Sequence, residues 1–208
     1  MSEKAARNLK PAILIVALAL IAAAFGVYLK GEGDGKVETA STPPPQGGVT
    51  RALSRGDMTA FVVKDERKPV PEVSFTAENG AALSLDQWKG RVVLVNLWAT
   101  WCAPCRKEMS TLAALQSDLG SKDFEVVAIS VDRKGLEASA KFLSEVGATA
   151  LKLYADPSTD ALTKLQAVGL PASILIDRQG REIGRLLGPA EWNSSDAKAL
   201  ITAALAEK

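Results

Sequence analysis

The sequence contains no histidine and only two cysteines among its 208 residues. Without histidine, a Ser–His–Asp triad, a Cys–His pair and an imidazole-ligated metal site are all excluded. Two thiols are too few for a four-cysteine zinc or iron–sulfur site within one chain. Arg106 follows Cys105, so the C-x-x-C-H pattern of haem attachment is absent as well. Thiol chemistry is the main chemistry that these absences leave open.

The chain also lacks an excess of charge of either sign. Its 25 basic and 24 acidic side chains give a formal net charge of +1. Nucleic-acid binding rests on a surplus of Lys and Arg, so no nucleic-acid partner is expected. Hydrophobic residues make up 47% of the chain. The length and composition therefore predict one domain of ordinary size with an additional terminal segment.

A charge-free apolar run at positions 11–29 follows a basic N-terminus. As a helix this run measures about 28 Å, close to the hydrocarbon thickness of a bilayer. We therefore predict a cytoplasmic N-terminus at 1–10, a transmembrane helix at 11–29, and an inner-membrane protein with its remaining chain in the periplasm. The alternative is a cleaved secretory signal with Ala22-Ala23-Ala24 at the cleavage site, although signal cores are usually shorter. Both interpretations export the rest of the chain.

A segment rich in Gly, Pro, Ser and Thr comes next and includes Pro43-Pro44-Pro45 and Gly47-Gly48. This composition is typical of a flexible tether. We assign residues 30–60 to a flexible linker, with a short helix expected within 51–60, and residues 61–208 to the folded domain.

Strand and helix patterns alternate through the domain. Asn79-Gly80 predicts a hairpin between strands 72–76 and 81–85. Two nearly continuous apolar runs, 91–98 and 124–131, predict strands that are buried on both faces. Between these runs, apolar residues at helical spacing (Met109, Leu112, Leu115 and Leu119) predict a helix that Gly120 ends. Further elements are expected at 136–146 (helix), 151–154 (strand), 158–167 (helix), 173–177 and 182–187 (strands), and from about 194 (helix). The pattern predicts an α/β domain with a mixed central sheet and helices on both faces.

The sequence Cys102-Ala103-Pro104-Cys105 lies between the first buried strand and the helix after it. A helix N-terminus offers free N–H groups and a partial positive charge, which stabilise a thiolate. The thiolate is the nucleophile of disulfide exchange, so we assign the attack to Cys102. Cys105 lies one turn further into the helix and is expected to resolve the mixed disulfide. The alternative is an inert disulfide, but so short a loop gains little stability from being closed.

Residues 91–109, RVVLVNLWATWCAPCRKEM, resemble the active-site segment of TlpA-type membrane-anchored thioredoxin-like proteins, most closely their alphaproteobacterial branch. The resemblance extends from about Phe61 to the C-terminus through VVAISVDR, LYADPS and GLPASILIDRQGREIGRLLGPAEW. It implies a thioredoxin fold with an N-terminal hairpin and a central αβ insertion, a periplasmic location, and reduction of disulfides in client proteins of cytochrome or oxidase assembly. It implies no cofactor and no metal beyond the redox-active dithiol.

The resemblance also assigns roles to residues around the dithiol. Leu170-Pro171 matches the cis-proline loop of the family, and Trp101 matches its exposed active-site aromatic. With Pro104, these residues are the expected substrate-binding set. Glu108 shares a helix face with Cys105 and matches an acid suggested to move protons to and from the dithiol. An ordinary first-turn glutamate is the alternative for Glu108.

Asn96 replaces the buried aspartate of thioredoxin itself and cannot exchange protons, so a relay must use Glu108 or water. We expect neighbouring backbone groups to satisfy the hydrogen bonds of the buried Asn96 side chain.

Two other functions stay open. A CcmG-like reductase of cytochrome c maturation is the nearer one, although Ala172 stands after Pro171 where that branch tends to have an acid. A copper-handling dithiol module is the other, because Cu(I) favours sulfur ligands. An exported reductase also needs an electron source, and we expect a thiol donor in the membrane. The motif alone leaves the direction of electron flow open, because C-x-x-C proteins span about −270 to −120 mV.

Overall fold

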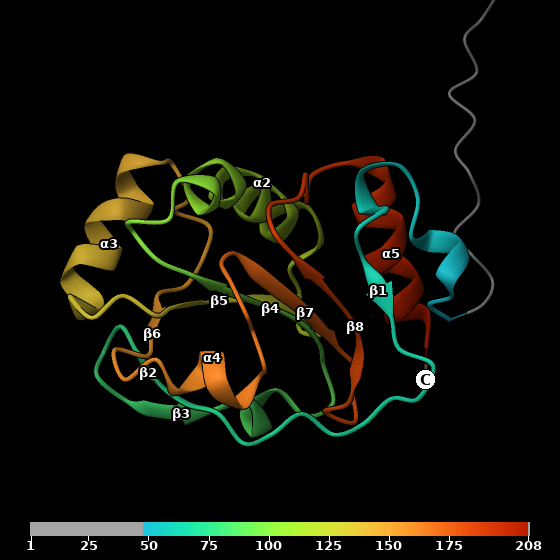
Figure 1. The fold of residues 1–208 in the computed structure, drawn as a ribbon, viewed down its shortest axis with the longest axis horizontal. Coiled ribbons are helices and arrows are strands. Elements are labelled where there is room, and N and C mark those ends of the chain that lie inside the picture. The colour runs from blue at the N-terminus through green and yellow to red at the C-terminus, as the bar shows by residue number, and fades with distance from the viewer. Residues whose placement is uncertain (1–47, 208) are drawn as a thin grey trace, which may run out of the picture. The chain divides into compact units, whose positions relative to one another are not determined.

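A mixed eight-stranded β-sheet forms the centre of residues 48–207, the part of the chain that the computed structural model describes (Figure 1). The strand order is β1-β8-β7-β4-β5-β6-β2-β3. Strands β4, β5 and β6 are parallel to one another, and every other pairing is antiparallel. The strands are β1 Val62–Val63, β2 Ser74–Ala77, β3 Ala82–Ser84, β4 Val92–Trp98, β5 Phe124–Ser130, β6 Tyr154–Ala155, β7 Ala172–Ile176 and β8 Glu182–Leu187.

The two central strands carry the expected apolar runs. Every residue of β4 and of β5 is buried, as in parallel strands covered on both faces. Their register pairs Val92 with Phe124 and Trp98 with Ser130, so both strands end at the same edge of the sheet. The loops after β4 and β5 therefore lie side by side at this edge.

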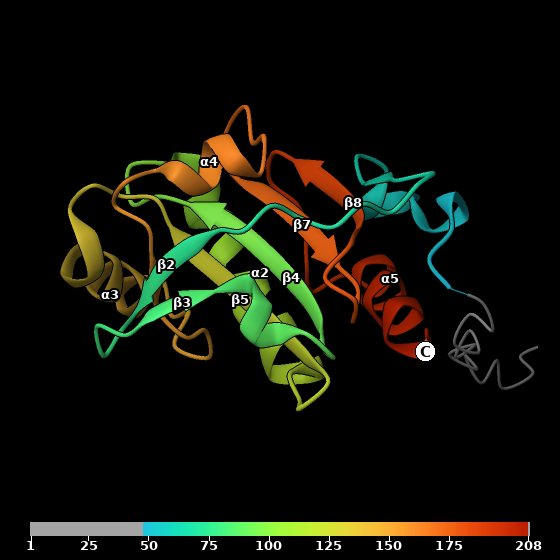
Figure 2. The ribbon, with the colours of Figure 1, turned by 90° about the horizontal axis from the view of Figure 1, so that it is seen from below.

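Helices cover both faces of the sheet, as the alternating pattern predicts. Figures 1 and 2 show α2, α3 and α5 on one face and the short α4 on the other. Their bounds are α2 Ala103–Leu119, α3 Gly135–Glu145, α4 Asp160–Lys164 and α5 Ser195–Ala206. The apolar stripe expected for 109–119 is buried against the sheet at Met109, Leu112 and Leu115. Among the later elements, strand 151–154 is shorter and lies at β6, and helix 158–167 is reduced to α4.

The folded domain begins earlier than the predicted boundary at residue 61. The expected helix within 51–60 is two short 3-10 helices, Arg51–Leu53 and Gly56–Met58, both in contact with α5. Val49, Leu53 and Met58 are buried. The assignment of residues 49–60 to a flexible linker is therefore wrong, because their apolar side chains complete the core over α5.

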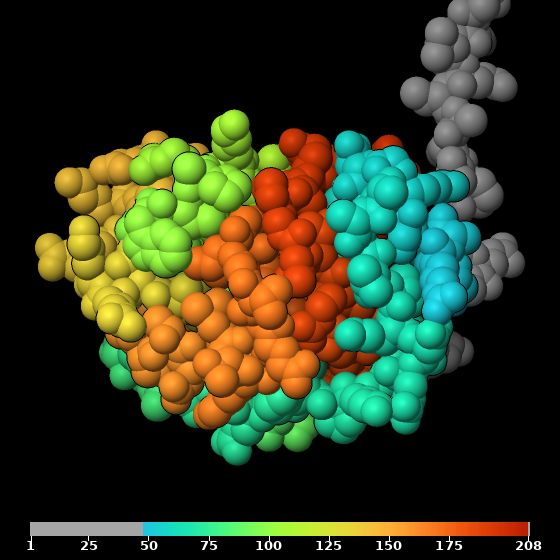
Figure 3. Space-filling model, in the orientation of Figure 1, coloured from blue at the N-terminus to red at the C-terminus, as the bar shows by residue number. Residues whose placement is uncertain are grey.

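The edge strand β1 has no counterpart in the sequence prediction. Val62 and Val63 pair with Arg185 and Gly184 of β8, and Figure 3 shows this N-terminal segment against the strand. A Cβ at Gly184 would lie 2.5 Å from the Phe61 ring, so only glycine allows this close approach. A two-residue strand is too short to show a periodic pattern, which explains why it was missed.

The predicted N-terminus, transmembrane helix and most of the predicted linker lie at residues 1–47, outside the described residues. Within residues 48–207, no helix combines the length and the apolar character needed to cross a membrane.

Candidate functional site

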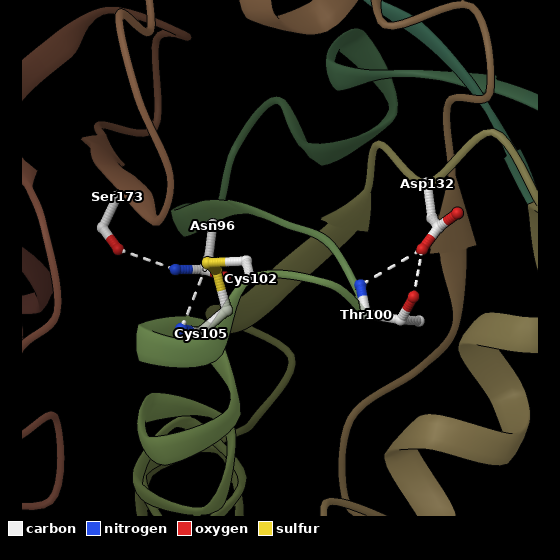
Figure 4. The surroundings of a disulfide bond; sticks show 6 residues. All are labelled: Asn96, Thr100, Cys102, Cys105, Asp132 and Ser173. Atoms are coloured by element: carbon white, nitrogen blue, oxygen red, sulfur yellow. Dashed lines mark hydrogen bonds between the residues drawn. A yellow bond between two sulfur atoms is a disulfide. The ribbon is translucent and has the colours of Figure 1, made fainter.

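Cys102 and Cys105 form a disulfide where β4 passes into α2 (Figure 4). Cys102 is the N-cap of α2, and its Sγ accepts a hydrogen bond from the backbone N–H of Cys105 at 3.2 Å. This N–H and the positive end of the helix stabilise the thiolate that reduction would produce at Cys102. Cys105 is completely buried, whereas Cys102 lines a surface groove. The geometry thus matches the predicted order, with the outer sulfur at Cys102.

An apolar groove of about 500 Å³ runs beside Cys102. The Trp101 side chain is 71% exposed at its rim, as expected for an active-site aromatic, and Val168 is 88% exposed. The remaining lining residues are Ala103, Pro104, Leu162, Ala167, Gly169 and Leu170. The Leu170–Pro171 peptide bond is cis, and Pro171 is buried next to the groove. Three of the four predicted substrate-binding residues therefore line one groove, to which α4 and its following loop add Leu162 and Val168.

The loop that carries Trp101 is attached to the end of β5. Asp132 accepts hydrogen bonds from the backbone N–H of Thr100 at 3.2 Å and from the Thr100 hydroxyl (Figure 4). Burial opposes the ionisation of Asp132, but hydrogen bonds from Thr100 and from the backbone of Lys134 outweigh it and lower the pKa of this carboxyl. The predicted strand ends place residues 99–101 and 131–132 at one edge of the sheet, which is the signal that could have identified Asp132.

Glu108 lies on α2, three residues after Cys105, and only 2% of its surface is exposed. Burial raises the pKa of Glu108 to about 8, against the opposing hydrogen bonds of Trp192, Asn96 and the Ala190 backbone. This carboxyl therefore carries a proton in much of the population at neutral pH. Its burial and raised pKa are compatible with the expected proton exchange with the dithiol, which stays a prediction.

Asn96 is buried in β4 beside this carboxyl. Its amide donates to Ser173 Oγ at 2.9 Å, so the expectation of purely backbone partners is wrong (Figure 4). Asn96 Oδ1 and Glu108 Oε2 are both buried without a hydrogen-bond partner.

Trp192 was not identified from the sequence as a site residue. It is completely buried in the loop between β8 and α5, and its indole N–H donates to Glu108 Oε1. The two residues are 84 positions apart in the chain. No local sequence pattern predicts such a contact, because the fold brings the two residues together.

Residues 48–207 hold no group of three or more Cys, Asp or Glu side chains arranged for a metal ion.

Comparison with known proteins agrees with this geometry. The family model described as Redoxin matches residues 65–201. The chain belongs to the Redoxin family. The thiol-disulfide oxidoreductase ResA of Bacillus thuringiensis is 28% identical over 142 residues, which cover 68% of this chain and 81% of that protein. The thiol:disulfide interchange protein HelX of Rhodobacter capsulatus is 30% identical over 140 residues, with coverages of 66% and 77%.

Comparison with solved structures shows that the fold is shared as well. A Chlorobium tepidum protein assigned as the thiol:disulfide interchange protein DsbE has a TM-score of 0.61 and 30% identity, covering 68% of this chain and 98% of its own. The thioredoxin domain of a Bacteroides vulgatus thiol-disulfide oxidoreductase has a TM-score of 0.56 and 26% identity, with coverages of 64% and 93%. The thioredoxin-like α/β fold is confirmed, and this Redoxin member is a thiol–disulfide oxidoreductase.

Proposed function

We propose that this protein is a TlpA-type, membrane-anchored reductant of client disulfides in the periplasm, acting during cytochrome oxidase or cytochrome assembly. The observation that carries the exchange chemistry is the Cys102–Cys105 pair, with its outer sulfur in an apolar groove and its inner sulfur beneath it. The membrane anchor, the location and the client class rest on the predicted segment at 11–29 and on the resemblance of residues 91–109 to TlpA-type proteins.

Client reduction begins from the dithiol form. The Cys102 thiolate attacks one sulfur of the client disulfide, which forms a mixed disulfide and releases the other client sulfur as a thiolate. The Cys105 thiol then gives its proton to the Glu108 carboxylate, and its sulfur attacks Cys102 Sγ. The second client thiolate leaves and takes up a proton. Two electrons have passed to the client, and the protein returns to the disulfide form.

Regeneration runs through the same groups in reverse. A donor thiolate attacks Cys102 Sγ of the disulfide and expels Cys105 as a thiolate. Protonated Glu108 is the nearby acid for this thiolate, and its raised pKa of about 8 keeps it protonated in the disulfide form at neutral pH. The donor ends as a disulfide after a second attack by its own partner thiol. An exported protein needs such a donor, and we infer a thiol protein of the same membrane.

The groove supports a proposal for how a client binds. Trp101, Val168 and Leu170 present apolar surface within one groove that also contains Cys102. Burying such surface is favourable by about 25 cal/mol per Å². We infer that clients present their disulfide in an accessible segment with apolar neighbours.

Trapping the mixed disulfide tests the proposal and identifies the partners. In Cys105→Ser the attack by Cys102 proceeds, but resolution is lost, so disulfide-linked partners should accumulate in membranes of the native host. Cys102→Ser/Cys105→Ser is the matched control and should trap nothing. Client reduction by the full-length protein should also fall to background in Cys102→Ser. Retained turnover in Cys102→Ser would contradict the assigned chemistry.

The direction of electron flow requires a separate measurement. Equilibration of the full-length protein with glutathione gives its reduction potential. A reductase should lie toward the −270 mV end of the range of C-x-x-C proteins, which extends to about −120 mV. A value near the oxidising end would instead indicate a protein that inserts disulfides.

A further inference from the structure

We propose that Trp192 is a positioning residue of the dithiol site: its indole N–H holds the Glu108 carboxyl so that Oε2 alone is free to exchange a proton with Cys105. The inference rests on the proposed function, in which Glu108 exchanges that proton.

The hydrogen bonds of the carboxyl divide its two oxygens into different roles. Oε1 accepts the indole N–H of Trp192, whereas Oε2 is buried without a partner. An indole carries a single donor and no acceptor, so it can bind the carboxyl but cannot pass on a proton. The indole is itself completely buried, which leaves no solvent path to Oε1 from that side. Oε2 is therefore the oxygen left for exchange on the helix face shared with Cys105.

Hydrogen bonds of the Trp192 backbone and of its loop fix the position of the indole. The backbone N–H of Trp192 donates to Thr111 Oγ1 at 3.1 Å, and the Thr111 hydroxyl donates to the Glu108 carbonyl oxygen at 2.9 Å. At the other end of the same loop, the Gly188 N–H donates to the Pro171 carbonyl at 2.9 Å. The loop 188–192 thus connects the cis-proline segment with the first turns of α2. Because its loop is attached at both ends, the Trp192 side chain is suited to orient the Glu108 carboxyl.

The surroundings of Glu108 make this single donor important. Among residues 48–207, the groups that act on its pKa are the side chains of Trp192 and Asn96 and the backbone of Ala190, and none of them is charged. Thr111 on α2 is neutral, and Cys105 lies about one turn before Glu108 on the same helix face. A hydrogen bond to a carboxylate is stronger than one to a neutral acid, so the indole favours the ionised form. Losing it should raise the pKa of Glu108 further.

Trp192→Phe removes the donor and keeps an aromatic ring in the core. We expect the titration midpoint of Glu108 to move upward by about one pH unit, as for the loss of one charge-assisted hydrogen bond. The measurement is ¹³C NMR of the full-length disulfide form, purified in mild detergent with labelled glutamate. The signal that disappears in Glu108→Gln assigns the resonance.

Trp98→Phe is the matched control. Trp98 is also completely buried, but its indole nitrogen has no hydrogen-bond partner. This control makes the same replacement of an indole by a smaller phenyl ring, but it removes no hydrogen-bond donor from Glu108. Its Glu108 midpoint should therefore stay at the wild-type value, which separates the loss of the N–H from general loosening of the core.

The kinetic consequence can be followed with 5,5′-dithiobis(2-nitrobenzoic acid) as the disulfide substrate. Attack by Cys102 releases the first thionitrobenzoate, and resolution by Cys105 releases the second. At pH 7, Trp192→Phe should slow the second release about tenfold, because one pH unit removes nine tenths of the carboxylate. The first release should change little. In the Glu108→Gln background, Trp192→Phe should have no further effect on the second release.

The outcomes separate the two proposals. A second release that is unchanged in Glu108→Gln at every pH overturns the proton-exchange role of Glu108, and the role of Trp192 with it. A slowed second release in Glu108→Gln together with a wild-type midpoint in Trp192→Phe overturns the role of Trp192 alone. If Trp192→Phe does not fold, Thr111→Val keeps the indole but releases its loop. A wild-type midpoint in Thr111→Val then counts against the positioning role.

Discussion

The buried carboxyl of Glu108 makes the stability of the domain depend on pH. Its pKa is about 8 in the folded disulfide form and returns to about 4.5 when the chain unfolds. A raised folded pKa gives stability that is fully present below about pH 4.5 and is lost as the pH rises toward 8. Between these values the loss is about 1.4 kcal/mol per pH unit at most.

We therefore expect Glu108→Gln to gain stability relative to the wild type as the pH rises from 5 to 9, by a few kcal/mol in total. Glutamine keeps the shape but has no charge to bury. Urea unfolding of both proteins with the disulfide intact, at pH 5, 7 and 9, measures the difference. Glu137→Gln, at an exposed glutamate of α3, is the control and should follow the wild type. If the free energies of unfolding of Glu108→Gln and of the wild type changed with pH in parallel, the Glu108 carboxyl would be ionised throughout this range.

The residues that the sequence identified are those with a local signal or a family motif. The two cysteines follow from the strand–C-x-x-C–helix pattern, and Trp101 and Pro171 follow from the resemblance. Trp192 and Ser173 were missed because their contacts with Glu108 and Asn96 join positions 84 and 77 residues apart. A hydrogen bond between distant positions leaves no periodic trace, so only the packed fold reveals it.

At the scale of elements, the inserted strand β6 is attached to the sheet by a buried charge. The Tyr154 hydroxyl of β6 donates to Glu125 of β5 at 2.7 Å. Lys152 and Arg91 pair with the same carboxylate at 3.1 and 3.0 Å. The Tyr154 ring also packs edge-on against Phe75 of the hairpin, with centroids 5.5 Å apart. One residue thus connects the insertion, the hairpin and the central sheet.

Tyr154→Phe should lower the free energy of unfolding by about 1–3 kcal/mol, because it leaves a buried carboxylate without one donor. Disulfide exchange should be unaffected, because Glu125 stands at the start of β5 and the dithiol follows the end of β4. Urea unfolding at pH 7 and the rate of exchange provide the two readouts. Lys152→Met removes an exposed partner of the same carboxylate and should cost less than about 1 kcal/mol. A slower exchange in Tyr154→Phe would contradict a purely structural role.

Long elements with a clear period were predicted well, and short ones were not. Strands β4, β5 and β8 and helices α3 and α5 lie within one or two residues of their expected bounds. The expected helix 158–167 is cut to Asp160–Lys164 because Thr159 and Gln166, at its two ends, have positive φ angles. The expected helix within 51–60 gives way to 3-10 turns whose side chains follow the surface of α5. In each case a tertiary contact or a local backbone turn outweighs the apolar spacing.

For the domain as a whole, the chain enters at the end of the sheet that is remote from the dithiol. The Val49 N–H donates to Glu207 at 2.7 Å, next to the C-terminal end of α5. Arg178 bridges this end to the Gly90 carbonyl, directly before β4. Cys102 follows the other end of β4, which is about 23 Å away for a seven-residue strand. The segment at residue 49 therefore does not cover the groove beside Cys102.

The entering segment is part of the folded domain, and truncation distinguishes it from a tether. A chain that begins at residue 48 should unfold with the same free energy as the full-length protein. A chain that begins at residue 61 should lose at least about 2 kcal/mol, because Leu53 and Met58 each bury apolar surface worth about 1.5–3 kcal/mol, part of which is offset by chain entropy.

In the full-length protein, Met58→Ala should reproduce most of this loss, at about 2–5 kcal/mol for a fully buried methionine. Arg51→Ala is the control, since its ion pair with Asp65 is exposed and contributes little. Equal stability of the chains that begin at 48 and 61 would mean that residues 48–60 contribute nothing to the core. Exchange rates below the unfolding transition should be the same in all these variants, because none of residues 48–60 lines the groove beside Cys102.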